Sequence, residues 1–248
     1  MKVGNRIHRV KSCPSTNDVA KDLALAGENE GTIIIAEEQT KGRGTRGRPW
    51  YSLAKKGLYA SVILRPPSSL LYLLPLAAGL AVSDACWAAL EIKVKLKWPN
   101  DLLWQRKKLG GILCETSLTG DRLSYAVLGL GININHSQED FPPDIRGQAT
   151  SLKLIKKKEI AMESLLASLW PCLDRWYHVI LDGRKEKIIN SFLKRSVFPL
   201  GKTLALLTDE GLIQGLFKGI NCWGGLVLEV GGEEKVFFSG QINHINGK

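Results

Sequence analysis

The sequence predicts an α+β protein with two units: a mixed β-sheet domain with flanking helices over residues 1–196, and a small β-barrel over residues 197–248. Up to about residue 196, β-branched and apolar runs alternate with segments of helical spacing. The character then changes near Phe198, where short strand patterns are joined by Gly- and Asp-bearing turns. The chain of 248 residues is long enough to bury a sizeable core in this arrangement.

The elements of the first unit follow from local patterns. A capped helix fits residues 14–31, where Ser15, Thr16 or Asn17 can cap the start and Gly27 can stop it. Residues 70–91 form the most apolar window and carry Pro75, Gly79 and Asp84, so they predict a buried helix and not a membrane span. Strands are predicted for 32–39, 57–66, 93–98, 101–104, 110–117 and 123–131.

The second half of the chain begins with a polar, Pro-containing connection at 136–150. Apolar positions at helical spacing predict a helix over 158–181, and a shorter helix fits 185–195. Beyond them, four short strands predict the small barrel.

Composition excludes several classes of protein. The apolar fraction of 44% and the charged fraction of 23% are ordinary for a soluble globular protein. Residues 1–11 are polar and basic, so no signal peptide is predicted. The five cysteines and four histidines are all isolated, which argues against a disulfide framework and a metal site. We therefore expect a cytoplasmic protein without a membrane segment.

The formal net charge of +10 raises the possibility of nucleic-acid binding. The alternative is a solvated basic surface. The longest basic run, at 156–158, is short, and no stripe of interleaved aromatic and basic residues predicts a base-stacking platform.

The stretch QTKGRGTRGRPW, residues 39–50, contains the G-x-G-x-x-G pattern of dinucleotide-binding proteins. In that class a helix opens directly after the last glycine, and an acidic residue follows about twenty positions later. Gly47 is followed instead by Arg48-Pro49-Trp50, and no acid lies near residues 64–67. No Gly-Lys-Ser/Thr ends the run either, so both the dinucleotide fingerprint and the phosphate loop are rejected.

What remains is a flexible loop with three arginines, Arg43, Arg46 and Arg48. Its glycines let the backbone wrap around a ligand, and guanidinium groups bind carboxylate or phosphate oxygens in a forked geometry. Trp50 can pack against an apolar ligand body or anchor the loop. The alternative is a basic surface turn.

Three further segments carry polar side chains at strand ends. KLKWPNDLLW places Lys97, Asn100 and Asp101 around a turn, RKKLGGILCE places Lys108 before an apolar strand, and VLGLGININ ends in Asn133 and Asn135. A lysine entering a partly buried site offers a compact charge to a carboxylate or a developing oxyanion. Each segment alone also fits a turn, a solvated lysine or a strand end.

Taken together and in order, STN, EEQTKGRGTRGRPW, KWPNDL, KLGGILCE and GLGININ resemble the biotin protein ligase family. The resemblance implies a catalytic domain of the biotin–lipoate ligase type, similar to class II aminoacyl-tRNA synthetases, with an SH3-like C-terminal barrel. It also implies that biotin and MgATP form biotinoyl-5′-adenylate. The biotin then passes to a lysine of the biotin carboxyl carrier protein or domain of acetyl-CoA or pyruvate carboxylase.

The resemblance also assigns site residues by motif position. Lys108 is the expected central catalytic charge, with Arg43 beside it. Biotin is expected to contact Ser15, Thr16, Asn17, Gln39, Arg43, Gly44, Thr45 and Lys108. The adenylate and phosphates are expected to contact Arg46, Arg48, Trp50, Asn100, Asp101 and Asn133. Magnesium is expected to arrive with ATP, and no protein metal site is predicted.

Thr45 stands where many members of the family have a further arginine, so we expect looser retention of the adenylate. Loop 39–50 is expected to be mobile without ligand and to order over the adenylate. Because STN begins at residue 15, we expect a ligase of the short form without a DNA-binding domain, either a monomer or a homodimer.

Two alternatives stay open. One is a lipoate or fatty-acid ligase of the same fold, since such enzymes also depend on a lysine. The other is a basic nucleic-acid-binding protein, which would show salt-dependent binding that does not need Lys108.

Overall fold

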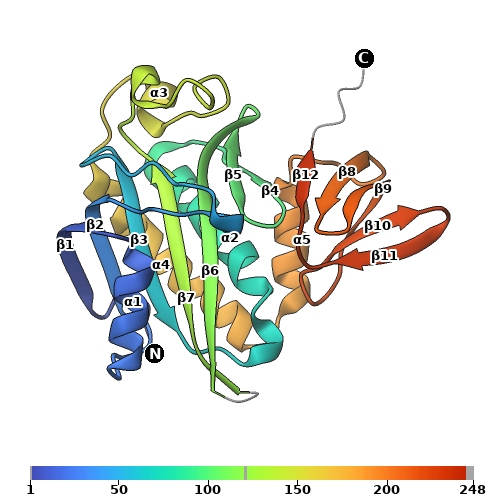
Figure 1. Ribbon diagram of the computed structural model, residues 1–248, viewed down its shortest axis with the longest axis horizontal. Coiled ribbons are helices and arrows are strands. Elements are labelled where there is room, and N and C mark those ends of the chain that lie inside the picture. Colours follow the sequence, from blue (N-terminus) through green and yellow to red (C-terminus); the bar gives the residue numbers. More distant parts are fainter. Residues whose placement is uncertain (1, 120–121, 244–248) are drawn as a thin grey trace.

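The computed structural model describes residues 2–119 and 122–243, and its centre is a seven-stranded mixed sheet (Figure 1). The strand order is β1-β2-β3-β7-β6-β5-β4. The β1–β2 pair is parallel, and every other neighbouring pair is antiparallel. The strands are β1 Ile7–Cys13, β2 Ile33–Gln39, β3 Gly57–Leu64, β4 Lys95–Lys97, β5 Asp101–Trp104, β6 Lys107–Thr119 and β7 Arg122–Asn133.

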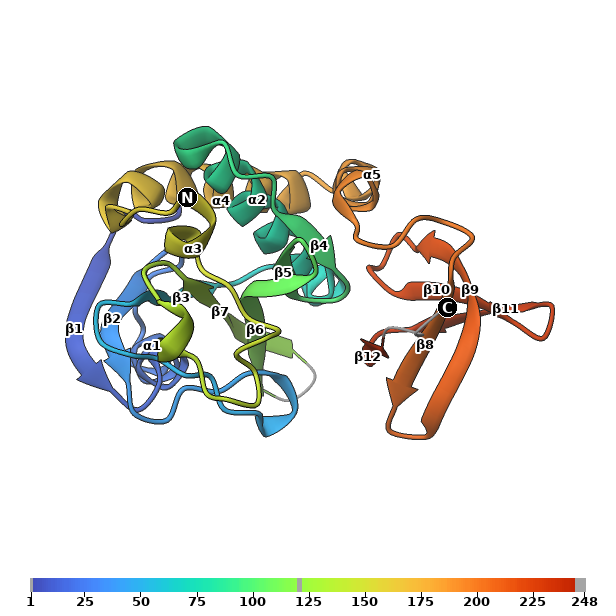
Figure 2. The same cartoon turned by 90° about the horizontal axis from the view of Figure 1, so that it is seen from above.

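Helices cover both faces of this sheet (Figure 2). The long helices α2 (Leu73–Leu90) and α4 (Met162–Leu181) lie together on one face, and α1 (Thr16–Leu25) lies on the other. The remaining helices are α3 (Leu152–Lys156) and α5 (Lys185–Arg195). Because the centre of the sheet is covered on both faces, all eight residues of β3 are buried. Its sequence, GLYASVIL, accordingly shows no alternation of apolar and charged residues.

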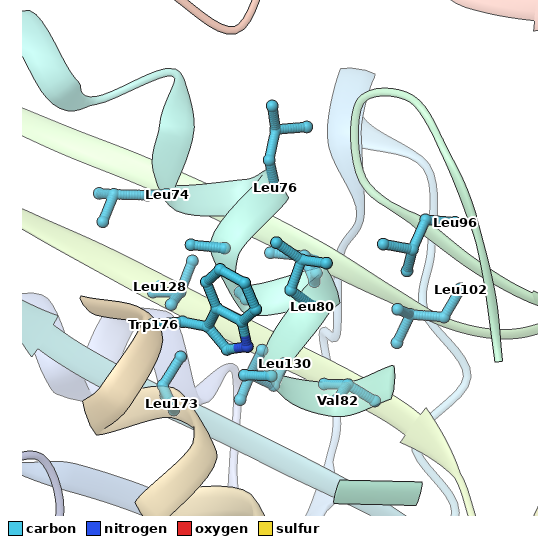
Figure 3. Close-up of a cluster of buried hydrophobic side chains, with 14 of the residues drawn as sticks. Leu74, Leu76, Leu80, Val82, Leu96, Leu102, Leu128, Leu130, Leu173 and Trp176 are labelled. Carbon is cyan, nitrogen blue, oxygen red and sulfur yellow. The ribbon is translucent and has the colours of Figure 1, made fainter. Parts of the chain in front are cut away.

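The larger core lies between the sheet and α2 and α4 (Figure 3). Leu80 of α2, Trp176 of α4 and Leu128 of β7 meet there, and all three are buried. By length and composition α2 could cross a membrane, but 67% of it is buried inside the protein. Its all-round apolar character is that of a core helix, as predicted.

The C-terminal segment forms a second, antiparallel sheet with the order β11-β10-β9-β8-β12. Five strands are present in the described chain where four were predicted, and no pairing joins the end strands β11 and β12 there. The indole Nε1 of Trp98 donates a 3.0 Å hydrogen bond to the Gly224 carbonyl, which ties this sheet to the unit built on the seven-stranded sheet. The strands are β8 Thr203–Thr208, β9 Gly211–Ile220, β10 Leu226–Val230, β11 Glu233–Phe237 and β12 Gln241–Asn243.

The predicted helices and strands are confirmed in their order, with shifted ends. The helix predicted for 14–31 is α1, shorter at both ends, and Gly27 follows it with a φ of +88°. Ser15 is the N-cap residue, although its side chain makes no capping hydrogen bond. Strand β1 and helix α3 were not predicted. The proposed domain boundary at 196/197 falls between α5 and β8 and stays a prediction.

Candidate active site

The start of α1 forms a buried polar floor together with β2 and β3. The Gln39 side-chain oxygen accepts hydrogen bonds from the Thr16 backbone nitrogen (2.8 Å) and hydroxyl (3.1 Å). The Ser61 hydroxyl lies 2.7 Å from the Thr16 hydroxyl and donates to the Asn17 side-chain oxygen at 2.6 Å. Ser15, Thr16 and Asn17 are all buried. This end of the site is uncharged and rich in both donors and acceptors.

The loop over residues 39–50 folds back on itself as a short ladder. The Trp50 backbone nitrogen donates to the Gly42 carbonyl at 2.9 Å, and the Gly44 nitrogen donates to the Arg48 carbonyl at 2.7 Å. A Cβ on Gly42 would lie 2.5 Å from the Trp50 carbonyl, so only glycine fits at this position. The loop thereby carries Arg43 and Trp50 into the site.

Arg43 is held by two carboxylates. Its guanidinium donates to both oxygens of Asp18 at 2.9 and 2.6 Å and to Glu115 at 3.0 Å. The hydrogen bond from Arg43 lowers the pKa of the Asp18 carboxyl. Burial raises the pKa of Glu115, but hydrogen bonds from Lys21, Asn17 and Arg43 outweigh burial and leave that pKa lowered. Both carboxylates are therefore charged near neutral pH and fix the position of Arg43.

Lys108 enters the site from the start of β6. Its ammonium lies 2.6 Å from an Asp101 oxygen and 5.7 Å from the centre of the Trp50 ring. Its backbone nitrogen donates to the Gln148 carbonyl at 2.7 Å, and its carbonyl accepts from Thr150 at 2.9 Å. These two backbone hydrogen bonds with the segment after β7 fix the position of Lys108.

Trp50 lies against a wall of glycines on β6 and β7. A Cβ on Gly131 would come within 2.6 Å of the Trp50 ring, and one on Gly129 within 2.5 Å of the Asn17 oxygen. With Trp50 in this position the remaining cavity is about 50 Å³.

The structure brings most of the predicted residues to this one pocket. Those that line it are Ser15, Thr16, Asn17, Gln39, Arg43, Gly44, Thr45, Trp50, Asn100 and Lys108. Asn100 also donates to the Ile112 carbonyl at 2.7 Å, so it holds the turn before β5 against β6.

Four predicted residues lie outside the lining. Asp101 reaches the site through Lys108, and Arg46 pairs with Asp209 of the C-terminal sheet at 3.4 Å. Arg48 is exposed. The Asn133 amide donates to the Thr150 carbonyl at 3.0 Å. Their assignment to ATP stays a prediction.

Sequence reasoning missed Asp18 and Glu115, the partners of Arg43. The sequence shows one carboxylate directly after STN, Asp18, and another at the end of KLGGILCE, Glu115. It does not show that both bind Arg43, which lies in a third segment. The two glycines of GLG were noted only as a strand end. Their spacing of two puts them on the same face of a strand, and that signal predicts close approach of another group.

The arrangement favours a ligand with an uncharged, hydrogen-bonding head and an anionic end. The floor of Thr16, Asn17 and Gln39 suits the head, and Arg43 and Lys108 suit a carboxylate or phosphate. Within residues 2–119 and 122–243, no group of three or more His, Cys, Asp or Glu side chains is placed to hold a metal ion.

Residues 10–133 match the biotin/lipoate A/B protein ligase family. The chain is also 33% identical over 230 residues to a bifunctional ligase/repressor BirA of Bacillus spizizenii, an alignment that covers 92% of this chain and 70% of that protein. The chain belongs to the biotin/lipoate A/B protein ligase family.

Other members agree. The biotin–[acetyl-CoA-carboxylase] ligase of Mycobacterium tuberculosis is 31% identical, over 93% of this chain and 86% of that protein. Among solved structures, the biotin protein ligase from Aquifex aeolicus in complex with biotin and ATP superposes with a TM-score of 0.83 and 30% identity, covering 96% of this chain and 98% of the other. The mixed sheet and the C-terminal sheet are thus a ligase fold of this family.

Proposed function

We propose that this protein is a biotin protein ligase, which activates biotin with MgATP and transfers it to a lysine of a biotin carrier domain. The observation that carries the proposal is that one pocket is lined both by uncharged hydrogen-bonding side chains, Thr16, Asn17 and Gln39, and by the cations Arg43 and Lys108. Biotin has a neutral ureido head and a carboxylate tail, and these two kinds of side chain suit its two ends. The 0.83 TM-score to a ligase in complex with biotin and ATP supports the same assignment.

The first step joins two anions. An oxygen of the biotin carboxylate attacks the α-phosphorus of ATP, a C–O–P linkage forms, and pyrophosphate leaves. Lys108 and Arg43 offset the repulsion between carboxylate and phosphate and hold the reactants in line. Magnesium enters as part of the substrate MgATP. The Lys108 ammonium lies 2.6 Å from an Asp101 carboxylate oxygen, and this ion pair is proposed to hold the lysine side chain at the pocket before substrate binds.

The second step transfers the acyl group. The amine of the carrier lysine attacks the acyl carbon, an amide forms, and AMP leaves with the bonding electron pair while the amine loses a proton. Loop 39–50 is proposed to cover the adenylate during this interval and to exclude water. Trp50 packs against Gly131 within the pocket lining, and we propose that it shifts when biotin enters.

The acceptor is a biotin carrier domain of a carboxylase, and we infer acetyl-CoA carboxylase or pyruvate carboxylase, as named enzymes of the family act on acetyl-CoA carboxylase. The proposal places the protein in the cytoplasm, as a monomer or a homodimer. It includes no DNA binding and no repressor activity.

The test is biotin transfer in a purified system. The protein, MgATP, biotin and a carrier domain of acetyl-CoA carboxylase are mixed, and the mass of the carrier is measured. We expect an increase of one biotinyl group, absent when the carrier lysine is replaced by arginine. Lys108→Ala should abolish the increase, whereas Lys107→Ala, at the exposed neighbouring position, should retain it. A carrier of unchanged mass with the wild-type protein would refute the proposal.

A further inference from the structure

Three lysines alternate with buried residues along β4 and the segment just before it, and the proposed catalysis does not use them. From residue 92 to 98, alternate residues are buried: Ile92, Val94, Leu96 and Trp98. The residues between them are Lys93, Lys95 and Lys97, which therefore lie on the other side of this extended segment. We call Lys93, Lys95 and Lys97 the basic row. Because β4 is an edge strand of the seven-stranded sheet, the row lies at the border of the domain.

One end of the basic row opens into a surface hollow of about 240 Å³ between α2, β4 and α5. Lys93, Lys95, Lys194 and Arg195 line it, together with Trp87. Trp87 is 51% exposed, and the Lys93 ammonium lies 5.5 Å from its ring centre. Tryptophan is enriched at the centre of protein–protein interfaces, and charged residues are more typical of the rim.

The positive charge of the hollow is mostly uncompensated. Its one carboxylate, Asp84, already accepts from Arg175 at 2.6 Å, from Arg195 at 2.7 Å and from the Trp176 indole at 2.8 Å. In the described part of the chain, Lys93, Lys95 and Lys194 form no ion pair. Three ammonium groups therefore face solvent around one aromatic ring.

The other end of the basic row reaches the active site. Burial lowers the pKa of Lys97, while the charge of Asp101 opposes this shift. Lys97 also pairs across the hairpin with Asp101, the partner of Lys108. From Lys93 to Lys97 the extended chain spans about 13 Å. The row thus leads from the hollow to the catalytic lysine.

We propose that the basic row and its hollow form the docking surface for the acidic face of the biotin acceptor domain, with Trp87 as the apolar anchor. This inference rests on the proposed function. The second step requires a macromolecule that presents a lysine beside Lys108, so its docking surface must adjoin the site and extend beyond it. A carboxylate-rich face beside that lysine complements the row in charge and length. A nucleic acid presents no lysine side chain as acceptor and is the less favoured occupant.

The test separates activation from transfer. Lys93→Glu/Lys95→Glu is compared with Lys2→Glu/Lys11→Glu, which makes the same charge change at exposed lysines beside β1, the opposite edge of the sheet. Biotin-dependent ATP–pyrophosphate exchange, measured without carrier, should stay within twofold of wild type in both. The KM for an acetyl-CoA carboxylase carrier domain should rise about tenfold or more in the β4 variant alone, because charge reversal removes electrostatic attraction.

Two further arms sharpen the result. The difference in KM should shrink when the salt concentration is raised to about 0.5 M, because salt screens exposed charges, and Trp87→Ala should also raise the KM for carrier. Equal KM values in the two double variants would overturn the inference. Loss of binding to a single-stranded DNA or RNA oligonucleotide, with carrier kinetics unchanged, would overturn it in favour of nucleic acid. A wild-type protein without biotin-dependent exchange would instead reject the proposed function itself.

Discussion

Gly129 and Gly131 lie two residues apart on β7, and each is in contact with a side chain of the pocket. The Asn17 amide occupies the place of a Cβ on Gly129, and the Trp50 ring occupies that of Gly131. The indole Nε1 of Trp50 is buried there without a hydrogen-bond partner. A buried, unpaired donor costs free energy, so the structure favours a ligand that displaces Trp50 or accepts from it.

His136 gives a prediction about pH at the residue scale. The side chain is 1% exposed and stacks on Phe141 with ring centres 5.1 Å apart. Burial lowers its pKa to about 4, although Asp140 opposes the shift. The unfolded chain takes up a proton below about pH 6.5, and the folded protein does so only near pH 4. Stability is therefore fully present above pH 6.5 and is lost as the pH falls towards 4.

The measurement is urea unfolding of the wild type and His136→Phe between pH 7.5 and 4.5. Across this range the wild type should lose up to about 3 kcal/mol more than the variant, because phenylalanine takes up no proton. Identical losses would show that His136 does not couple folding to pH.

Individual site residues were predictable where the family resemblance assigns them by motif position. Thr16, Gln39, Arg43 and Lys108 were assigned in this way, and the structure brings all four to one pocket. Asp18 and Glu115 were not assigned, because α1, β6 and the loop meet only in the folded protein. Thr45 lines the pocket, and its effect on adenylate retention stays a prediction.

At the scale of elements, buried segments were predictable and exposed ones were not. Strand β3 and helix α2 have continuous apolar sequences that fit their burial. Strand β1 reads IHRVKSC and only Cys13 is buried, so its place in the sheet depends on backbone pairing with β2 and not on an apolar pattern. Helix α3 has five residues and is capped by Ser151, whose hydroxyl accepts from the Leu154 nitrogen at 3.1 Å. So short a helix has no periodicity to detect.

Helix α2 should be the main source of stability in the catalytic unit. Leu80 is fully buried in the cluster of Figure 3, so Leu80→Ala should lower the free energy of unfolding by about 2–5 kcal/mol through lost burial and a cavity. Leu25→Ala, at a position that is 71% exposed at the end of α1, should change it by no more than about 0.5 kcal/mol. Urea unfolding checks both values. A loss below about 1 kcal/mol for Leu80→Ala would contradict the assigned role of α2.

At the scale of the whole molecule, the C-terminal segment contacts the first unit at β4 and at loop 39–50. The connection after α5 pairs with β4, since the Val197 nitrogen donates to the Leu96 carbonyl at 3.0 Å. Arg46 of the loop pairs with Asp209 of the β8–β9 turn at 3.4 Å. The predicted C-terminal barrel is an antiparallel sheet among the described residues, with no pairing there that closes it. The contacts between these distant segments were outside the reach of local sequence patterns.

The proposed function depends on formation of the biotinoyl adenylate, and ATP–pyrophosphate exchange measures that reaction directly. Biotin, lipoate and octanoate are supplied separately to the wild type and to Lys108→Ala. We predict exchange that requires biotin and falls at least a hundredfold in the variant, on the order of what loss of one charge-stabilising group costs. Exchange driven by lipoate or octanoate and not by biotin would contradict the assigned substrate, and no exchange with any of the three acids would contradict the ligase reaction itself.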